Sequence, residues 1–139
     1  MIEFLFLGIL TLVPLMYLVV AVFDVERNVF AVTQAAREAG RAYATAGDPA
    51  SAQERAAYSA ALAMRDQGVP STDLSLRYVA VGAGCAGGGG AQSLVPGADF
   101  AVCVTHTVQV PGIPGFLAGR ANTVTGRYVV HVDDFRAGR

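Results

Sequence analysis

The stretch that decides the fold is Phe4–Phe23, FLFLGILTLVPLMYLVVAVF, a run of twenty uncharged residues. A helix of that length, rising about 1.5 Å per residue, spans a hydrocarbon core about 30 Å thick. A secretory signal has a basic start, a shorter apolar core and a small-residue cleavage site, and residues 1–27 show none of the three. We therefore expect a membrane helix that persists in the mature chain, with a kink near Leu10 to Pro14.

The helical pattern continues beyond the apolar run without a break. Apolar residues recur at alternating steps of three and four, which places them on one stripe of a helix: Val22, Val25, Val29, Val32, Ala36, Ala39 and Tyr43. The charged residues between Asp24 and Arg41 lie off that stripe. Gly47 is a typical helix terminator. We predict one long helix over residues 1–46, the second half of which buries its stripe against a soluble domain.

Residues 47–139 are predicted to form a small head domain. Asp48-Pro49 supplies a cap and a first-turn proline for a second helix, which runs from Pro49 or Ser51 to Gln67. From there the apolar period changes to two, which predicts three strands near residues 73–80, 98–110 and 122–132. Their apolar faces carry Leu74, Leu76, Tyr78 and Ala80, then Phe100, Val102, Val104, His106, Val108 and Val110, then Val124, Tyr128, Val130 and Val132. The fold class is α+β, with an antiparallel sheet packed on the long helix.

The two cysteines bear on the compartment. Cys85 lies in the glycine-rich loop 82–90 and Cys103 on the outer face of the second strand, and such an even pair fits a disulfide outside the cytoplasm. Two buried free thiols are the alternative. Arginines follow the apolar run and none precedes it, so the positive-inside rule alone points the head domain inward. We follow the cysteines and expect a single-pass protein with its head outside the cytoplasm.

Little in the sequence points to catalysis or to a cofactor. The net charge of −1 gives no basis for nucleic-acid binding, and no residue set combines a nucleophile with a base. Gly82, Gly84 and Gly87 match GxGxxG, but no helix pattern follows on which a pyrophosphate would lie. A metal site is poorly supported, because the cysteines and histidines lack ligand spacing.

The two histidines and one turn have different surroundings in the sequence. His106 lies on an apolar strand face, where a hydrogen-bonded core histidine is the favoured interpretation. His131, beside Asp133 and Asp134, is interpreted as part of a solvated strand end. The turn at residues 111–117 presents apolar side chains that either fold back on the sheet or meet a partner or a membrane surface: Ile113, Phe116 and Leu117.

Several of these features together resemble a known family, the TadE-like pseudopilins and minor pilins of tight-adherence (Tad, Flp-type) pili. They are Glu3-Phe4 opening an apolar helix, Pro14 inside it, AAREAGRAYA at Ala35–Ala44, and a small sheet domain with a cysteine pair and a VxVPGIPG turn. The resemblance implies a structural subunit that Phe4–Phe23 holds in membrane lipid and that the same helix packs into a filament. It also implies partners: other pilin subunits, the Tad assembly machinery and a prepilin peptidase.

The resemblance assigns a role to Glu3. In type IV pilin-like proteins a glutamate near the mature N-terminus faces the amino terminus of a neighbouring subunit. The family has this glutamate at the fifth mature position, after a leader ending in glycine, whereas here it is at position three and no such leader is visible. Glu3 either pairs in this way or lies in the lipid headgroup layer. A membrane-tethered binding module that never enters a filament is the alternative function.

Overall fold

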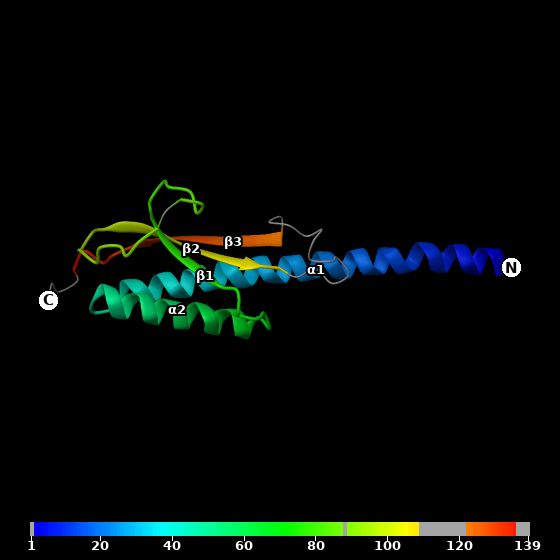
Figure 1. The fold of residues 1–139 in the computed structure, drawn as a ribbon, viewed down its shortest axis with the longest axis horizontal. Helices are drawn as coiled ribbons and strands as arrows, with labels where there is room; N and C mark the ends of the chain where they lie inside the picture. The colour runs from blue at the N-terminus through cyan, green and yellow to red at the C-terminus, as the bar shows by residue number, and fades with distance from the viewer. Residues whose placement is uncertain (1, 88, 109–121, 136–139) are drawn as a thin grey trace.

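The computed structural model describes residues 2–87, 89–108 and 122–135. The elements in these residues are α1 (Ile2–Ala44), α2 (Pro49–Asp66), β1 (Ser75–Ala80), β2 (Asp99–Thr107) and β3 (Thr123–His131). In Figure 1, α1 is one long rod, and the other elements gather along its second half while its first half projects alone. The α+β fold predicted from the sequence is confirmed.

Helix α1 continues through Pro14 and ends at Ala44, two residues before the predicted end. Its buried residues are Asn28, Ala31, Val32, Ala35, Ala36, Ala39, Gly40 and Tyr43. The predicted stripe is therefore wrong in its first part, because Val22, Val25 and Val29 remain 50%, 39% and 44% exposed. The head covers α1 only from about Asn28 onward, so the earlier stripe residues have nothing to pack against.

Helix α2 begins where its capping sequence predicts. The Asp48 carboxylate accepts hydrogen bonds from the backbone N–H groups of Ala50 and Ser51, both at 3.0 Å, and from the Ser51 hydroxyl at 2.6 Å. Led by the bonds from Ser51, these contacts lower the pKa of Asp48. The helix then lies along α1 with small side chains and one methionine buried between them: Ala52, Ala56, Ala60, Ala63 and Met64.

The three strands form one antiparallel sheet in the order β1-β2-β3, and its inner face packs against the helices. Phe100, Val102 and Val104 lie in the core as predicted. The Tyr43 ring of α1 contacts both Tyr78 and Phe100, with ring centroids 4.6 and 5.1 Å apart. The predicted position of Ala80 is wrong: Ala80 is exposed at the end of β1.

Helix α1 and strand β3 approach each other closely in the head. A Cβ atom added to Gly126 would meet the backbone of Val32 and would lie 2.8 Å from the Thr33 nitrogen. A Cβ atom on Gly40 would lie 2.6 Å from the Val130 side chain. Two glycines thus allow the helix to rest almost directly on the strand.

Candidate functional site

The first half of α1, which we call the apolar segment (Ile2–Phe23), is the largest uncovered feature of the molecule. Every residue from Ile2 to Val20 is exposed, and the large side chains range from 44% exposed at Val19 to 85% at Phe4. The segment is apolar on all sides, not along one stripe. Its length and composition are sufficient for one membrane span.

The three predicted assembly residues all lie in this segment. Glu3 is in the first turn, Phe4 projects from the helix, and Pro14 is inside it. Phe4 also lines a shallow apolar groove together with Leu5, Gly8, Ile9 and Leu12. Since nothing lies within 4 Å of the position of a Gly8 Cβ, this face of the helix is open to close approach by another chain.

Polar groups inside the apolar segment are few. The Thr11 hydroxyl donates to the Leu7 carbonyl at 2.8 Å, so it is satisfied by its own helix. Pro14 has no backbone N–H, which leaves the Leu10 carbonyl without its usual helical donor. The segment is suited to an apolar environment along nearly its whole length.

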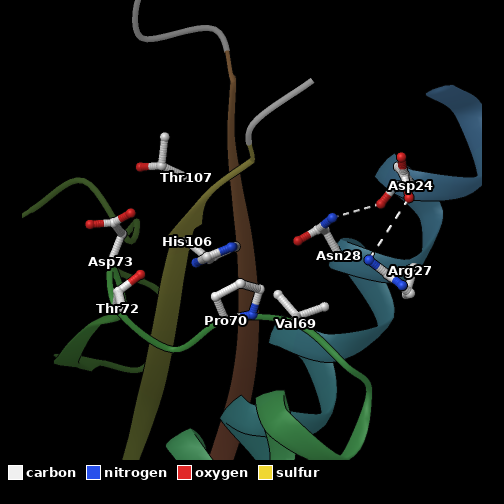
Figure 2. Close-up of a pocket in the computed structure, with 9 residues that line it drawn as sticks. All are labelled: Asp24, Arg27, Asn28, Val69, Pro70, Thr72, Asp73, His106 and Thr107. Atoms are coloured by element: carbon white, nitrogen blue, oxygen red, sulfur yellow. Dashed lines mark hydrogen bonds and ion pairs between the residues drawn. The ribbon is translucent and has the colours of Figure 1, made fainter. Parts of the chain in front are cut away.

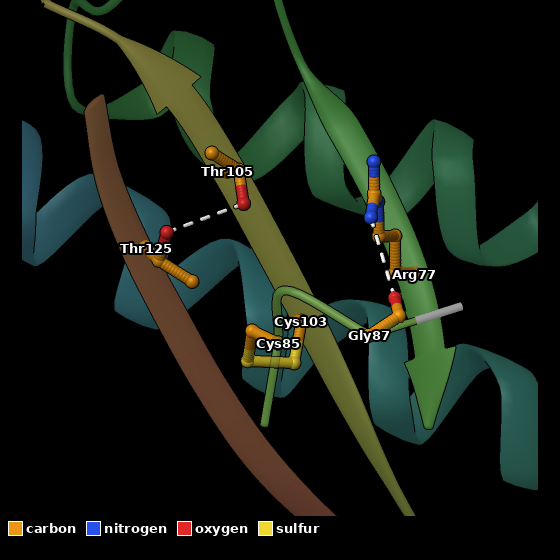
Figure 3. Close-up of a disulfide and its surroundings, with 6 residues drawn as sticks. All are labelled: Arg77, Cys85, Gly87, Cys103, Thr105 and Thr125. Carbon is orange, nitrogen blue, oxygen red and sulfur yellow. Dashed lines mark hydrogen bonds between the residues drawn. A yellow bond between two sulfur atoms is a disulfide. The ribbon is translucent and has the colours of Figure 1, made fainter. Parts of the chain in front are cut away.

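The predicted disulfide is present between Cys85 and Cys103, whose Cα atoms are 5.7 Å apart. It lies on the outer face of the sheet, opposite the helices, and covers Val79 and Ala101 (Figure 3). The alternative of two free thiols is therefore wrong. Stable disulfides form mainly outside the reducing cytoplasm.

The glycine-rich loop runs along the free edge of β1. The Gly90 N–H donates to the Tyr78 carbonyl at 3.2 Å, and the Arg77 guanidinium donates to the Gly87 carbonyl at 3.3 Å (Figure 3). Further along, the Tyr43 hydroxyl donates to the Gln92 carbonyl at 2.9 Å. No helix follows the GxGxxG glycines in the described part of this loop.

A pocket lies at the base of the head, where the apolar segment ends. It is lined by Asp24, Arg27, Asn28, Val69, Pro70, Thr72, Asp73, His106 and Thr107, and encloses about 320 Å³ (Figure 2). His106 is buried as predicted, but its predicted hydrogen bonding is incomplete, because Nδ1 has no partner within the described residues. Burial lowers the pKa of His106, and the nearby Asp73 carboxylate partly opposes this effect.

The second histidine, His131, is part of a surface cluster. His131 and Asp134 were named from the sequence, but Asp99 was not. His131 Nδ1 lies 2.7 Å from the Asp99 carboxylate, and Nε2 lies 3.6 Å from that of Asp134. The hydrogen bond to Asp99 is the largest cause of the raised pKa of His131. Asp99 was not foreseen because it lies on a different strand. Among the described residues, no group of three or more histidine, cysteine or acidic side chains is arranged to hold a metal ion.

The predicted contact residues Ile113, Phe116 and Leu117 lie outside the described residues. The pocket around His106 was not predicted as a site. The available signal was a cluster of polar residues, Asp24 to Asn28, directly after the apolar run, combined with a histidine on an apolar strand face.

Comparison with known proteins adds no assignment: no family model, no curated protein and no solved structure matches this chain.

Proposed function

We propose that this protein is a structural, pilin-like subunit, a minor pilin or pseudopilin of a Tad-type pilus, anchored in a membrane by α1 before assembly. The observation that carries the proposal is the division of α1 into two halves. The second half is the core of the head, and the first half is an uncovered helix that is apolar on all sides. Such a helix needs an apolar environment that the rest of the described chain does not supply.

A membrane and a bundle of identical helices both supply that environment. In lipid the apolar segment spans the hydrocarbon, and in a filament its large side chains and the groove beside Gly8 pack against copies of themselves. The head outside the cytoplasm agrees with the disulfide. The role requires neither a reaction nor a cofactor.

Glu3 gives the proposal a specific contact. A carboxylate at the mouth of an apolar helix is costly inside a bundle unless a cation neutralises it, and the α-amino group of a neighbouring subunit is a suitable partner. Before assembly, Glu3 lies at the membrane surface, where water and headgroups solvate it. Assembly therefore depends on Glu3 more strongly than membrane insertion does.

The test replaces Glu3 with Ala and compares it with Glu26→Ala, a matched change at an exposed glutamate on the same helix. Glu3→Ala should insert normally but reduce incorporation into sheared filaments by roughly tenfold or more, because one charge-assisted hydrogen bond contributes about 1.5–3 kcal/mol. Glu26→Ala should match the wild type. Immunoblots of the sheared and membrane fractions measure both effects, and normal incorporation of Glu3→Ala would sink the proposed pairing.

A second function, a membrane-tethered binding module, is favoured by the pocket at the base of the head. Such a module keeps its apolar segment in lipid permanently. The same shearing experiment separates the two functions, since a tethered module stays with the membranes even in the wild type.

A further inference from the structure

The pocket at the base of the head contains a buried side chain whose hydrogen bonding is incomplete. His106 is only 5% exposed, and its Nδ1 atom finds no partner within the described residues. Buried polar atoms are nearly always hydrogen-bonded, so an atom of this kind lining a cavity of about 320 Å³ marks a place for a small ligand.

The charges around His106 are separated along the pocket. Figure 2 shows Asp73 on one side of the histidine and Arg27 on the other. Arg27 also forms a surface ion pair with Asp24, at 3.8 Å, which leaves guanidinium N–H groups available. With two carboxylates and one guanidinium, the lining has a formal charge of −1. This arrangement suits a dipolar ligand with a cationic end near Asp73 and an anionic end near Arg27.

The groups between the two ends can accept hydrogen bonds. Because burial lowers the pKa of His106, its ring is neutral at neutral pH and one ring nitrogen accepts. The Asn28 side-chain amide donates to the Asp24 carbonyl at 2.7 Å, and its oxygen points away from that bond toward His106 (Figure 2). Two acceptors and a carboxylate are suited to an ammonium group with several N–H donors.

The position of the pocket identifies the source of the ligand, and this step rests on the membrane anchoring proposed above. The apolar segment Ile2–Phe23 is about 33 Å long at about 1.5 Å per residue, close to the thickness of a hydrocarbon core. Asp24 and Arg27, which follow it directly, then lie in the headgroup layer. A lipid headgroup is the dipolar molecule present there at high concentration.

We propose that this pocket binds the headgroup of a phospholipid that carries a primary ammonium, namely phosphoethanolamine. The ammonium lies between Asp73 and the ring of His106 and also donates to the Asn28 amide oxygen. The phosphate lies against Arg27. The acyl chains run down beside the apolar segment.

The first test measures which lipids remain bound to the full-length chain. The protein is reconstituted in nanodiscs of equimolar phosphatidylethanolamine, phosphatidylcholine and phosphatidylglycerol, and native mass spectrometry counts the lipids retained after release. Phosphatidylethanolamine should be enriched roughly tenfold over phosphatidylcholine, because trimethylation removes every N–H donor. Equal retention of the two, or enrichment of phosphatidylglycerol instead, would overturn the proposal.

Exposed pocket residues make the test specific without endangering the fold. Asp73→Asn and Arg27→Gln should each abolish the enrichment. The matched controls Glu54→Gln on α2 and Arg37→Gln on α1, both exposed and outside the pocket, should retain it. Enrichment that survives both pocket variants would mean that the lipid lies elsewhere, and would refute the site.

A soluble arm separates this site from the membrane anchoring on which it rests. Glycerophosphoethanolamine, but not glycerophosphocholine, should shift the ¹⁵N resonances of the His106 imidazole in detergent. Absence of that shift refutes the site whether or not the chain inserts. Carbonate extraction from membranes tests insertion separately, so failure there counts against the proposed function and is recorded independently of the pocket.

Discussion

The two halves of α1 belong to one unbroken helix yet differ in almost every packing property. The apolar segment carries Leu, Phe, Ile and Val on all sides, and its residues from Ile2 to Val20 are exposed. The second half, from Asn28 to Tyr43, buries mainly alanines and one glycine. Hydrophobicity alone therefore does not decide which half enters the core, because the more apolar half is the exposed one. Small residues permit the close approach of α2 and β3, whereas large residues suit a lipid or multi-helix environment.

The largest expected effect comes from adding one methyl group where the second half of α1 touches the sheet. Gly126→Ala should lower the free energy of unfolding by more than about 3 kcal/mol, because the new Cβ would meet the Val32 backbone, which cannot rotate away as a side chain can. Urea denaturation of the full chain in detergent, followed by near-ultraviolet circular dichroism, measures the change.

The matched control is the same substitution in the other half of the helix. Gly8→Ala meets nothing within 4 Å and should leave the stability of the head unchanged. If both substitutions have the same effect, or if Gly126→Ala is neutral, the contrast between the two halves of α1 is wrong.

Much of the difference between the two halves of α1 could be predicted from the sequence. The features that could not be predicted were missed for a physical reason. Caps, breakers and apolar periods are local signals, so they predicted both helices, the three strands and the faces that carry Phe100 and Cys103. Periodicity predicts which residues share a helix face, but not how far along the helix the head covers that face. For this reason Val22 was placed in the stripe although it is half exposed.

The missed features depend on contacts between segments distant in the chain. Gly126 reads as an ordinary strand residue until α1 is seen resting on it. The pocket around His106 joins residues of α1, of the α2–β1 connection and of β2, and no single stretch contains its pattern. Likewise the Asp99 partner of His131 comes from the neighbouring strand.

The disulfide provides the next test of the difference between the two halves of α1, because it stabilises the head from the face opposite α1. Reduction of Cys85–Cys103, which are 18 positions apart, should lower the free energy of unfolding of the head by about 3 kcal/mol by the chain-entropy model. Membrane association of the apolar segment should not change. Urea midpoints with and without reductant measure the stability of the head. Flotation with vesicles measures the membrane association of the apolar segment.

A variant without the bond supplies the control for that experiment. Cys85→Ser combined with Cys103→Ser should be less stable than the oxidised wild type and should not respond to reductant. A wild-type chain that loses its vesicle association on reduction would contradict the independence of the two halves.

The smallest expected effect is the change in the stability of the head between about pH 5 and 8. The head contains two histidines, whereas residues 4–23 contain no acidic or histidine side chain. The folded pKa of His106 is lowered from 6.5, so its contribution to stability is complete above 6.5 and is lost as the pH falls through the lowered folded pKa. The folded pKa of His131 is raised, so its contribution is present below 6.5 and is lost as the pH rises through the raised value.

Because the two contributions oppose each other, single variants reveal them where the wild type shows little slope. Relative to His106→Gln, the wild type should lose stability as the pH falls, because burial disfavours the protonated ring and the Asp73 carboxylate only partly opposes this effect. Asp24 and Arg27 also line the pocket that the ring faces. Relative to His131→Gln it should gain stability, by a smaller amount, because the pairs with Asp99 and Asp134 are exposed and solvent-screened. Urea midpoints at several pH values measure both slopes, and slopes of the same sign would show that one of the two environments is wrongly described. The membrane association of the apolar segment should stay constant over the same pH range, since residues 4–23 contain no acidic, basic or histidine side chain.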